Sequence, residues 1–157
     1  KKDKDFKEVE KVINIISQIR SFKNELNVSP GSFIDISLGK INKKNQVFFK
    51  ENEIILKKIG RINNFFNKDV NKPSATLVIG GDLFKLYFEE NVDLNLIKEN
   101  LISKQRKYAT EMDKINSRLR NKNFVDRAPK YIVDQEKTNY NNLKNDIKKI
   151  SLIVKSL

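Results

Sequence analysis

The fold is decided by residues 133–157, which read VDQEKTNYNNLKNDIKKISLIVKSL. Positions that could form a helical stripe recur in steps of three and four, and all but one are apolar or aromatic: Val133, Glu136, Tyr140, Leu143, Ile147, Ile150, Val154 and Leu157. This is the heptad spacing of a helix that packs one stripe against another helix. We therefore predict a long helix with a partner helix close by.

The partner helix is predicted directly upstream, over about 27 residues that end near residue 120. Its stripe repeats at sevens, with two further members: Leu94, Leu101, Tyr108 and Ile115, joined by Met112 and Leu119. The short connection NKNFVDRAP (121–129) can end one helix and start the next with proline in its first turn. Two such helices fold back on each other. Residues 93–157 should form an antiparallel coiled-coil arm about 40 Å long, at roughly 1.5 Å per residue, and its self-contained stripe favours a monomer.

Residues 1–92 alternate between helical and strand patterns. A helix is predicted over 5–26, with its apolar face at Phe6, Val9, Ile13, Ile16, Ile19, Phe22 and Leu26, and it should stop at NVSPG (27–31). A strand over 33–38, one helix over 46–59 ended by Gly60, a strand over 61–66, and a hairpin of 75–79 with 83–88 should follow. The expected fold class is α+β, mainly helical: a small helix-on-mixed-sheet unit followed by the long antiparallel coiled-coil hairpin.

The charge favours a polyanionic partner. The chain has 32 Lys plus Arg against 20 Asp plus Glu, a net charge of +12. Residues 96–157 hold 15 of these cations and 7 of these anions, so +8 of the charge lies in the arm. We favour nucleic acid over a membrane surface, because the charge faces no compact apolar stripe and Trp is absent. The alternative is that the lysines only solvate the helices.

The residue types that are missing exclude several kinds of chemistry. The chain has no Cys and no His, which excludes thiolate zinc sites, disulfides, cysteine nucleophiles and imidazole catalysis. No apolar run approaches the roughly 20 residues that span a bilayer. We expect no catalytic residue and no metal site here, and a cytoplasmic location fits the lack of Cys. The start at Lys1, in mid-pattern and without Met, suggests a piece of a longer protein.

Basic residues along the first arm helix and its tip are the candidate phosphate ligands: Lys104, Arg106, Lys107, Lys114, Arg118, Arg120, Lys122, Arg127 and Lys130. Cations at such spacing can follow a phosphate backbone and make binding strongly dependent on salt. Phe124 and Val125 lie at the tip, where a short loop would normally be polar. They can stack on an exposed base or plug the end of the seam.

Two segments carry a resemblance to a known family. The segment IRSFKNELNVSPG (19–31) and the tip LRNKNFVDRAP (119–129), followed by Val133 and Glu136-Lys137, resemble valyl-tRNA synthetases. Two positions depart from the family's pattern: Lys23 stands where Arg is frequent, and Asp126 puts an acid in a tip that is usually more basic.

The resemblance implies three parts and a function. Residues 1–27 would end the anticodon-binding helical bundle, 28–92 would be a connecting α+β unit, and 93–157 the tRNA-binding arm, which lies against the outer corner of the L-shaped tRNA. Arg20 and Lys23 join the candidate RNA-binding residues. The parent enzyme would attach valine to tRNA(Val) in an ATP-dependent reaction, whereas this part would hold the tRNA, bind no cofactor and catalyse nothing.

Two other functions remain open. The coiled coil could serve protein assembly through apolar residues outside the seam: Ile97, Ile102, Ile132, Leu152 and Ile153. It could also be a generic structured-RNA-binding module.

Overall fold

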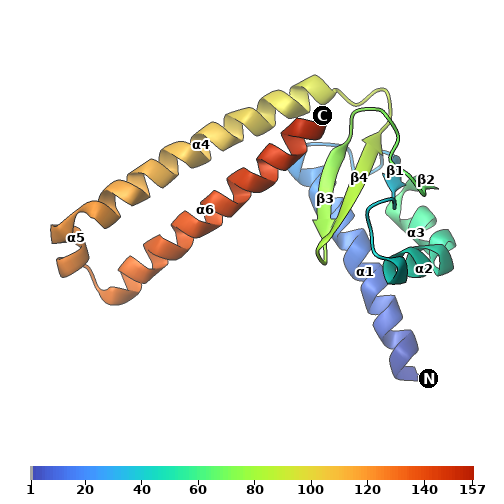
Figure 1. Ribbon diagram of the computed structural model, residues 1–157, viewed down its shortest axis with the longest axis horizontal. Coiled ribbons are helices and arrows are strands. Elements are labelled where there is room, and N and C mark those ends of the chain that lie inside the picture. The colour runs from blue at the N-terminus through green and yellow to red at the C-terminus, as the bar shows by residue number, and fades with distance from the viewer. Residues whose placement is uncertain (1) are drawn as a thin grey trace. The chain divides into compact units, whose positions relative to one another are not determined.

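The computed structural model describes residues 2–157 and divides into two compact units (Figure 1). The first runs up to Ile97 and includes Ser156 and Leu157; the second is Lys98–Lys155. Lys1, where the first expected part begins, lies outside the described residues. The fold is α+β and mainly helical, with a small mixed sheet and a long helical hairpin, as predicted.

The first unit is built on a four-stranded sheet in the order β2-β1-β4-β3. Strand β1 pairs with β2 in parallel and with β4 antiparallel, and β3 and β4 form the predicted hairpin. Gly80 and Gly81 form the turn of this hairpin, with φ angles of 58° and 84°. Residues other than glycine rarely adopt such positive φ angles. The strands are β1 Ile34–Ser37, β2 Ile62–Phe66, β3 Ala75–Ile79 and β4 Asp82–Phe88.

Helix α1 (Lys2–Glu25) ends where the sequence predicted. Asn27 adopts a φ of 56°, and the backbone N–H of Val28 donates to the carbonyl of Lys23 at 2.8 Å. This is the left-handed turn that closes many helices and satisfies their last carbonyl groups. The chain then enters β1.

The predicted single helix over 46–59 is wrong, because the chain forms two helices that meet at Asn52. These are α2 (Lys43–Glu51) and α3 (Glu53–Gly60). The Asn52 amide donates to the carbonyl of Phe48 and to Glu8 of α1, both at 3.0 Å. A side chain that bonds nearby backbone in this way competes with the helix. The apolar residues keep their helical spacing across Asn52. For this reason the sequence pattern did not predict the break between α2 and α3.

The core of the first unit forms where the helices meet the sheet. Phe49 of α2 packs against Phe65 and Phe84, with ring centroids 5.6 and 5.3 Å away, and Leu56 of α3 is completely buried. In α1 the buried apolar residues are Val12, Ile15, Ile16, Ile19 and Phe22.

The predicted apolar face of α1 is partly wrong. Phe6, Val9 and Ile13 are exposed, whereas Val12 and Ile15, which the prediction left out, are buried. Two apolar faces overlap at helical spacing in this segment. The contacts of α1 with β3 and α3 determine which of them is covered.

The second unit is the predicted hairpin. Helices α4 (Leu94–Arg120) and α6 (Lys130–Ser156) lie side by side and antiparallel (Figure 1). The seam buries Leu101, Ile115, Val133 and Ile150, as the heptad spacing predicted. The connection holds a short helix that the sequence did not indicate, α5 (Lys122–Arg127), whose first turn is capped by the Asn121 side chain.

We expect Leu56→Ala to lower the free energy of unfolding by about 2 to 5 kcal/mol, because it opens a cavity in a fully buried site. Ile54 is the matched control, since it lies two residues away and is 86% exposed, against 0% for Leu56. Ile54→Ala should change stability by less than about 0.5 kcal/mol. Urea unfolding followed by circular dichroism measures both. Equal effects would show that α3 is not packed as described.

We expect Asp69→Asn to destabilise the protein near neutral pH but not in acid. The hydroxyl of Ser37, 2.7 Å away, and then Lys85 and Lys40 hold the pKa of Asp69 below its usual value, against the opposing effect of burial. A depressed carboxylate pKa contributes stability above the unfolded value of about 3.9, and this is lost as pH falls through the folded value. Denaturant unfolding from pH 7 down to pH 3 should show the gap closing; a constant gap would contradict this assignment.

Candidate nucleic-acid interface

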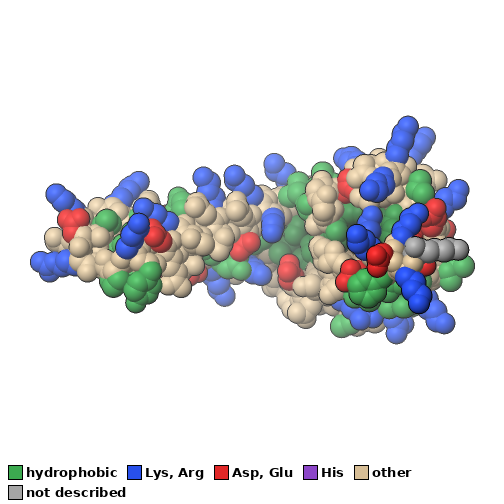
Figure 2. All heavy atoms as spheres, turned by 90° about the horizontal axis from the view of Figure 1, so that it is seen from below, with side chains coloured by type: hydrophobic (Ala, Val, Ile, Leu, Met, Phe, Trp, Pro, Cys, Tyr) green, Lys and Arg blue, Asp and Glu red, His purple; other side chains and the backbone are tan. Residues whose placement is uncertain are grey.

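The hairpin carries most of the protein's net positive charge. Residues 98–155 contain 15 Lys or Arg and 7 Asp or Glu, a net charge of +8 out of +12. Figure 2 shows Lys and Arg side chains projecting along it and around its tip. Helix flanks outside a seam face solvent, so these charges are available to a polyanion.

The candidates on α4 lie in two rows, one on each side of its seam. Lys104, Lys107, Lys114 and Arg118 follow one flank at steps of three, seven and four, interrupted by Glu111. Arg106 and Arg120 are 14 residues apart, or two heptads, and lie on the other flank. All six are exposed. The structure therefore separates residues that the sequence placed in a single set.

Three candidates come together at the tip. Lys122 and Arg127 belong to α5, and Lys130 is the first residue of α6. All three are exposed, as is Asp126 between them. The tip is thus a compact cationic end with one acid.

The apolar residues of the tip differ in exposure. Phe124 is half-buried and Val125 is exposed. Tyr131 is 70% exposed beside Lys130, and sequence reasoning did not single it out. Tyr131 lies two residues before the seam position Val133, so its spacing alone places it outside the seam. This spacing could have predicted that its ring is exposed. The half-buried Phe124 is compatible with both of its predicted roles.

One cationic candidate is already paired within the hairpin. Arg118 donates from Nε at 3.1 Å and from Nη2 at 2.7 Å to the same oxygen of Glu136. Glu136 is the single acid in the predicted seam of α6, and this ion pair gives it a partner across the hairpin. Arg118 therefore helps to join α4 to α6, and its charge is partly neutralised.

Arg20 and Lys23 belong to the first unit, and only Arg20 is exposed. Its guanidinium donates to the carbonyl of Ile59 at 3.3 Å. Lys23 is 1% exposed, and its ammonium donates to the carbonyl of Ser32 at 2.6 Å. Burial, and secondly Arg61, lower the pKa of Lys23. The structure thus places Lys23 in the core, where it holds the turn after α1 and offers no surface to a phosphate.

The apolar residues that could serve protein assembly are mostly covered. Ile97 and Ile153 are buried, Ile102 and Ile132 are half-buried, and Leu152 is exposed. Within residues 2–157, no cluster of acidic side chains could hold a metal ion. No helix in this range is long and apolar enough to cross a membrane.

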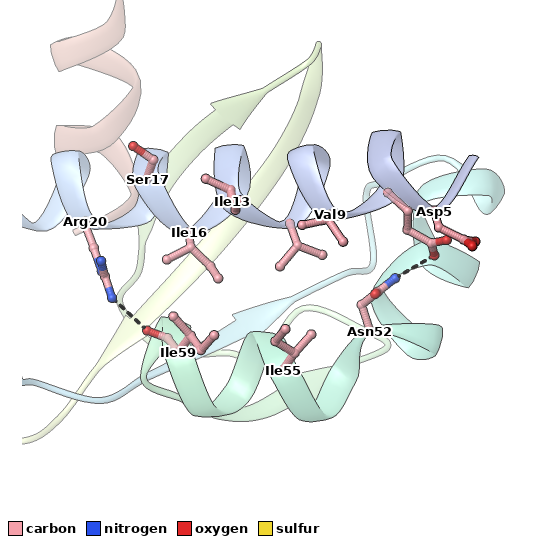
Figure 3. A pocket seen from close by; sticks show the side chains of 11 residues that line it. Asp5, Val9, Ile13, Ile16, Ser17, Arg20, Asn52, Ile55 and Ile59 are labelled. Atoms are coloured by element: carbon pink, nitrogen blue, oxygen red, sulfur yellow. Dashed lines mark hydrogen bonds between the residues drawn. The ribbon is translucent and has the colours of Figure 1, made fainter. Parts of the chain in front are cut away.

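The first unit has an apolar groove of about 500 Å³ between α1 and α3. Val9, Ile13 and Ile16 line it from α1, and Ile55 and Ile59 line it from α3 (Figure 3). Polar residues form its rim: Asp5, Glu8, Ser17, Arg20 and Asn52. Most of these isoleucine and valine side chains are exposed, which is unusual for so many neighbouring apolar groups.

Comparisons with known proteins agree with the position of the charged hairpin. Residues 93–155 match the family model described as the valyl tRNA synthetase tRNA binding arm. The chain is 65% identical over 156 residues to a valine–tRNA ligase of Pelagibacter ubique, a match that covers 99% of the chain and 18% of that protein. It is 30% identical over 162 residues to a valine–tRNA ligase of Prochlorococcus marinus (96% and 17%) and 27% identical over 157 residues to one of Aquifex aeolicus (99% and 13%).

The chain thus spans less than a fifth of the length of these relatives. The similarity nevertheless extends over both units, because the matches cover nearly all of residues 1–157. The family model falls on the hairpin alone. Residues 93–155 therefore belong to the family of valyl tRNA synthetase tRNA-binding arms, and the chain as a whole corresponds to a segment of the valine–tRNA ligases.

Proposed function

We propose that this chain binds tRNA(Val) through its helical hairpin, as the C-terminal region of a valine–tRNA ligase. The observation that carries the proposal is that +8 of the net charge of +12 lies in residues 98–155, nearly the same residues that match the tRNA-binding arm. We expect the protein to act as a monomer in the cytoplasm. The ATP-dependent attachment of valine is assigned to the part of the parent enzyme outside this chain.

The hairpin is suited to hold a large folded RNA by its backbone. Its seam fixes two helices of 27 residues, each about 40 Å long at 1.5 Å per residue, so the cations are carried on a stiff support. Lys and Arg that contact phosphates set the position of the RNA without reading its bases. We infer that the hairpin grips the outer corner of the tRNA, so that contacts far from the reaction orient its acceptor end.

The proposed phosphate ligands are the exposed cations of α4 and the tip: Lys104, Arg106, Lys107, Lys114, Arg120, Lys122, Arg127 and Lys130. Arg118 contributes less, because Glu136 already accepts two of its hydrogen bonds. Phe124 is proposed to pack against an exposed base at the tip, and Arg20 to contact RNA from the first unit. Lys23 is left out of the surface because its ammonium is buried and bonded to Ser32.

We also propose three parts for the chain: 1–27 as the end of a helical bundle, 28–92 as a connecting unit and 93–157 as the arm. The groove between α1 and α3 supports the first of these. Its exposed isoleucine and valine side chains would be covered by the rest of the parent chain, which makes up more than four fifths of the relatives' length.

The binding proposal is tested by changing three tip cations together. The triple variant Lys122→Gln, Arg127→Gln, Lys130→Gln should weaken binding to folded valine tRNA by roughly tenfold or more at 0.1 M salt. Three lost phosphate contacts should also reduce the slope of log affinity against log salt by about 2 to 3. Fluorescence anisotropy across a salt series measures both quantities.

The matched control removes the same charge from exposed lysines of α2: Lys43→Gln, Lys44→Gln, Lys50→Gln. The unmodified chain should bind valine tRNA and another folded tRNA better than an unstructured RNA of equal length. Equal binding to all three would reduce the function to nonspecific polycation behaviour. No binding at all would favour the assembly role.

The groove proposal predicts a difference between the isolated chain and the full-length enzyme. Ile13 is exposed here, so Ile13→Ser should change the stability of this chain by less than about 0.5 kcal/mol. In the full-length enzyme the same change should lower the unfolding temperature, because a buried apolar contact is lost. Ile16→Ser is the control and should destabilise both, since Ile16 is already buried. A neutral Ile13→Ser in the full-length enzyme would count against the groove being covered.

A further inference from the structure

A row of lysines runs along α6. Only its first member, Lys130, is among the predicted phosphate ligands. Lys130, Lys137, Lys144, Lys148 and Lys155 follow each other at steps of seven, seven, four and seven residues. At about 100° per residue these steps place all five within a sector of about 40° of the helix surface. All five are exposed. The helix therefore carries one continuous cationic edge along almost its whole length.

The other flank of α6 does not share this charge. It carries Gln135, Asn139, Asn142, Asp146 and Lys149, one cation and one anion among neutral amides. Lysines that only keep a helix soluble could occupy either flank equally well. Their concentration on one flank, with Asp134 as the acid beside the row, is better explained by an anionic partner that approaches from that side.

No acid within the chain neutralises the row. In the described range 2–157, the ion pair across the hairpin is Arg118–Glu136, and none of the five lysines makes an ion pair. Unpaired like charges along one edge repel each other and oppose folding slightly. A bound polyanion would relieve that repulsion.

A hydrogen bond within the hairpin identifies the α4 residues that share a face with this row. Gln105 donates to the hydroxyl of Ser151 at 2.6 Å. Ser151 lies between the row and the seam of α6, and Gln105 lies on the side of the α4 seam that leads to Arg106 and Arg120, opposite the side of Lys104. The lysine row and the flank of Arg106 and Arg120 therefore lie on the same face of the hairpin.

We propose that this lysine row is a phosphate-binding track, with Lys137, Lys144, Lys148 and Lys155 as RNA-binding residues of α6. This inference rests on the proposed tRNA binding, and it assigns a sugar-phosphate strand to this face of the arm. The row is about 37 Å long at 1.5 Å per residue, so it can follow several consecutive phosphates. Lysine ammonium groups act as point charges and have no fixed geometry for a base edge, so the track contributes affinity without sequence preference.

The test uses the whole 157-residue chain with the triple variant Lys137→Gln, Lys144→Gln, Lys148→Gln. Binding to folded valine tRNA and to a second folded tRNA should weaken by roughly tenfold or more at 0.1 M salt, to the same extent for both. The slope of log affinity against log salt should fall by about 2 to 3. The corresponding triple Lys→Arg variant keeps the charge and should retain binding.

Controls separate the row from charge in general. The α2 variant, with Lys43, Lys44 and Lys50 changed to Gln, loses the same charge and should bind nearly as well as the unmodified chain. Lys149→Gln, on the other flank of α6, should have little effect. Circular dichroism should be unchanged by the row variant, because these side chains lie outside the seam. The unfolding temperature should stay the same or rise slightly, since the variant removes like charges that repel each other.

The outcomes distinguish this inference from the function on which it rests. If the tip variant loses affinity and salt dependence while the row variant keeps both, the track is overturned and tRNA binding by the arm stands. If the α2 control weakens binding as much as the row variant, the track is also overturned, because only total charge matters. If the unmodified chain does not prefer folded tRNA, both proposals fall.

Discussion

The seam between α4 and α6 is the constraint on which the arrangement of charge depends. Its steps of three and four residues determine which side chains are covered and therefore which remain on the flanks. Two polar contacts fix the register between the helices: Gln105 with Ser151, and Arg118 with Glu136. A slip along the seam would leave Glu136 without its partner, so the register also positions the flanking cations.

Concentrating positive charge on a narrow hairpin opposes folding, and the seam offsets this cost. Leu101, Ile115, Val133 and Ile150 are removed from water, which stabilises the pair of helices without requiring an acid beside each cation. The cations can then remain unpaired on the flanks and available to phosphates. The seam of the two helices thus provides most of the stability of the hairpin, and their flanks provide the surface proposed to bind RNA.

The first unit departs from ordinary burial rules in two places. Lys23 is a charged side chain inside the core, where the carbonyl of Ser32 accepts from it and burial lowers its pKa. Val9, Ile13 and Ile55 are apolar side chains at the surface, grouped in one groove. Lys23 serves the turn between α1 and β1, which is a structural role. The groove has no such explanation within the described residues 2–157, and its covering by a further part of a longer chain is a proposal.

The sequence by itself determined the hairpin, the β3–β4 turn, the end of α1 and the location of the charge, because each follows from spacing or from residues adjacent in the chain. Only the tertiary structure decided which of two overlapping apolar faces of α1 is buried, since that depends on α3 and β3. It also decided the break at Asn52, where Glu8 from a distant helix accepts a hydrogen bond, and the burial of Lys23. The candidate cations were identifiable from composition, but their division into flanks, and the pairing of Arg118 with Glu136, required the second helix to be in place. The spacing of residues along the chain shows which of them can share one face of a helix. Contacts between segments far apart in sequence determine which other element covers that face.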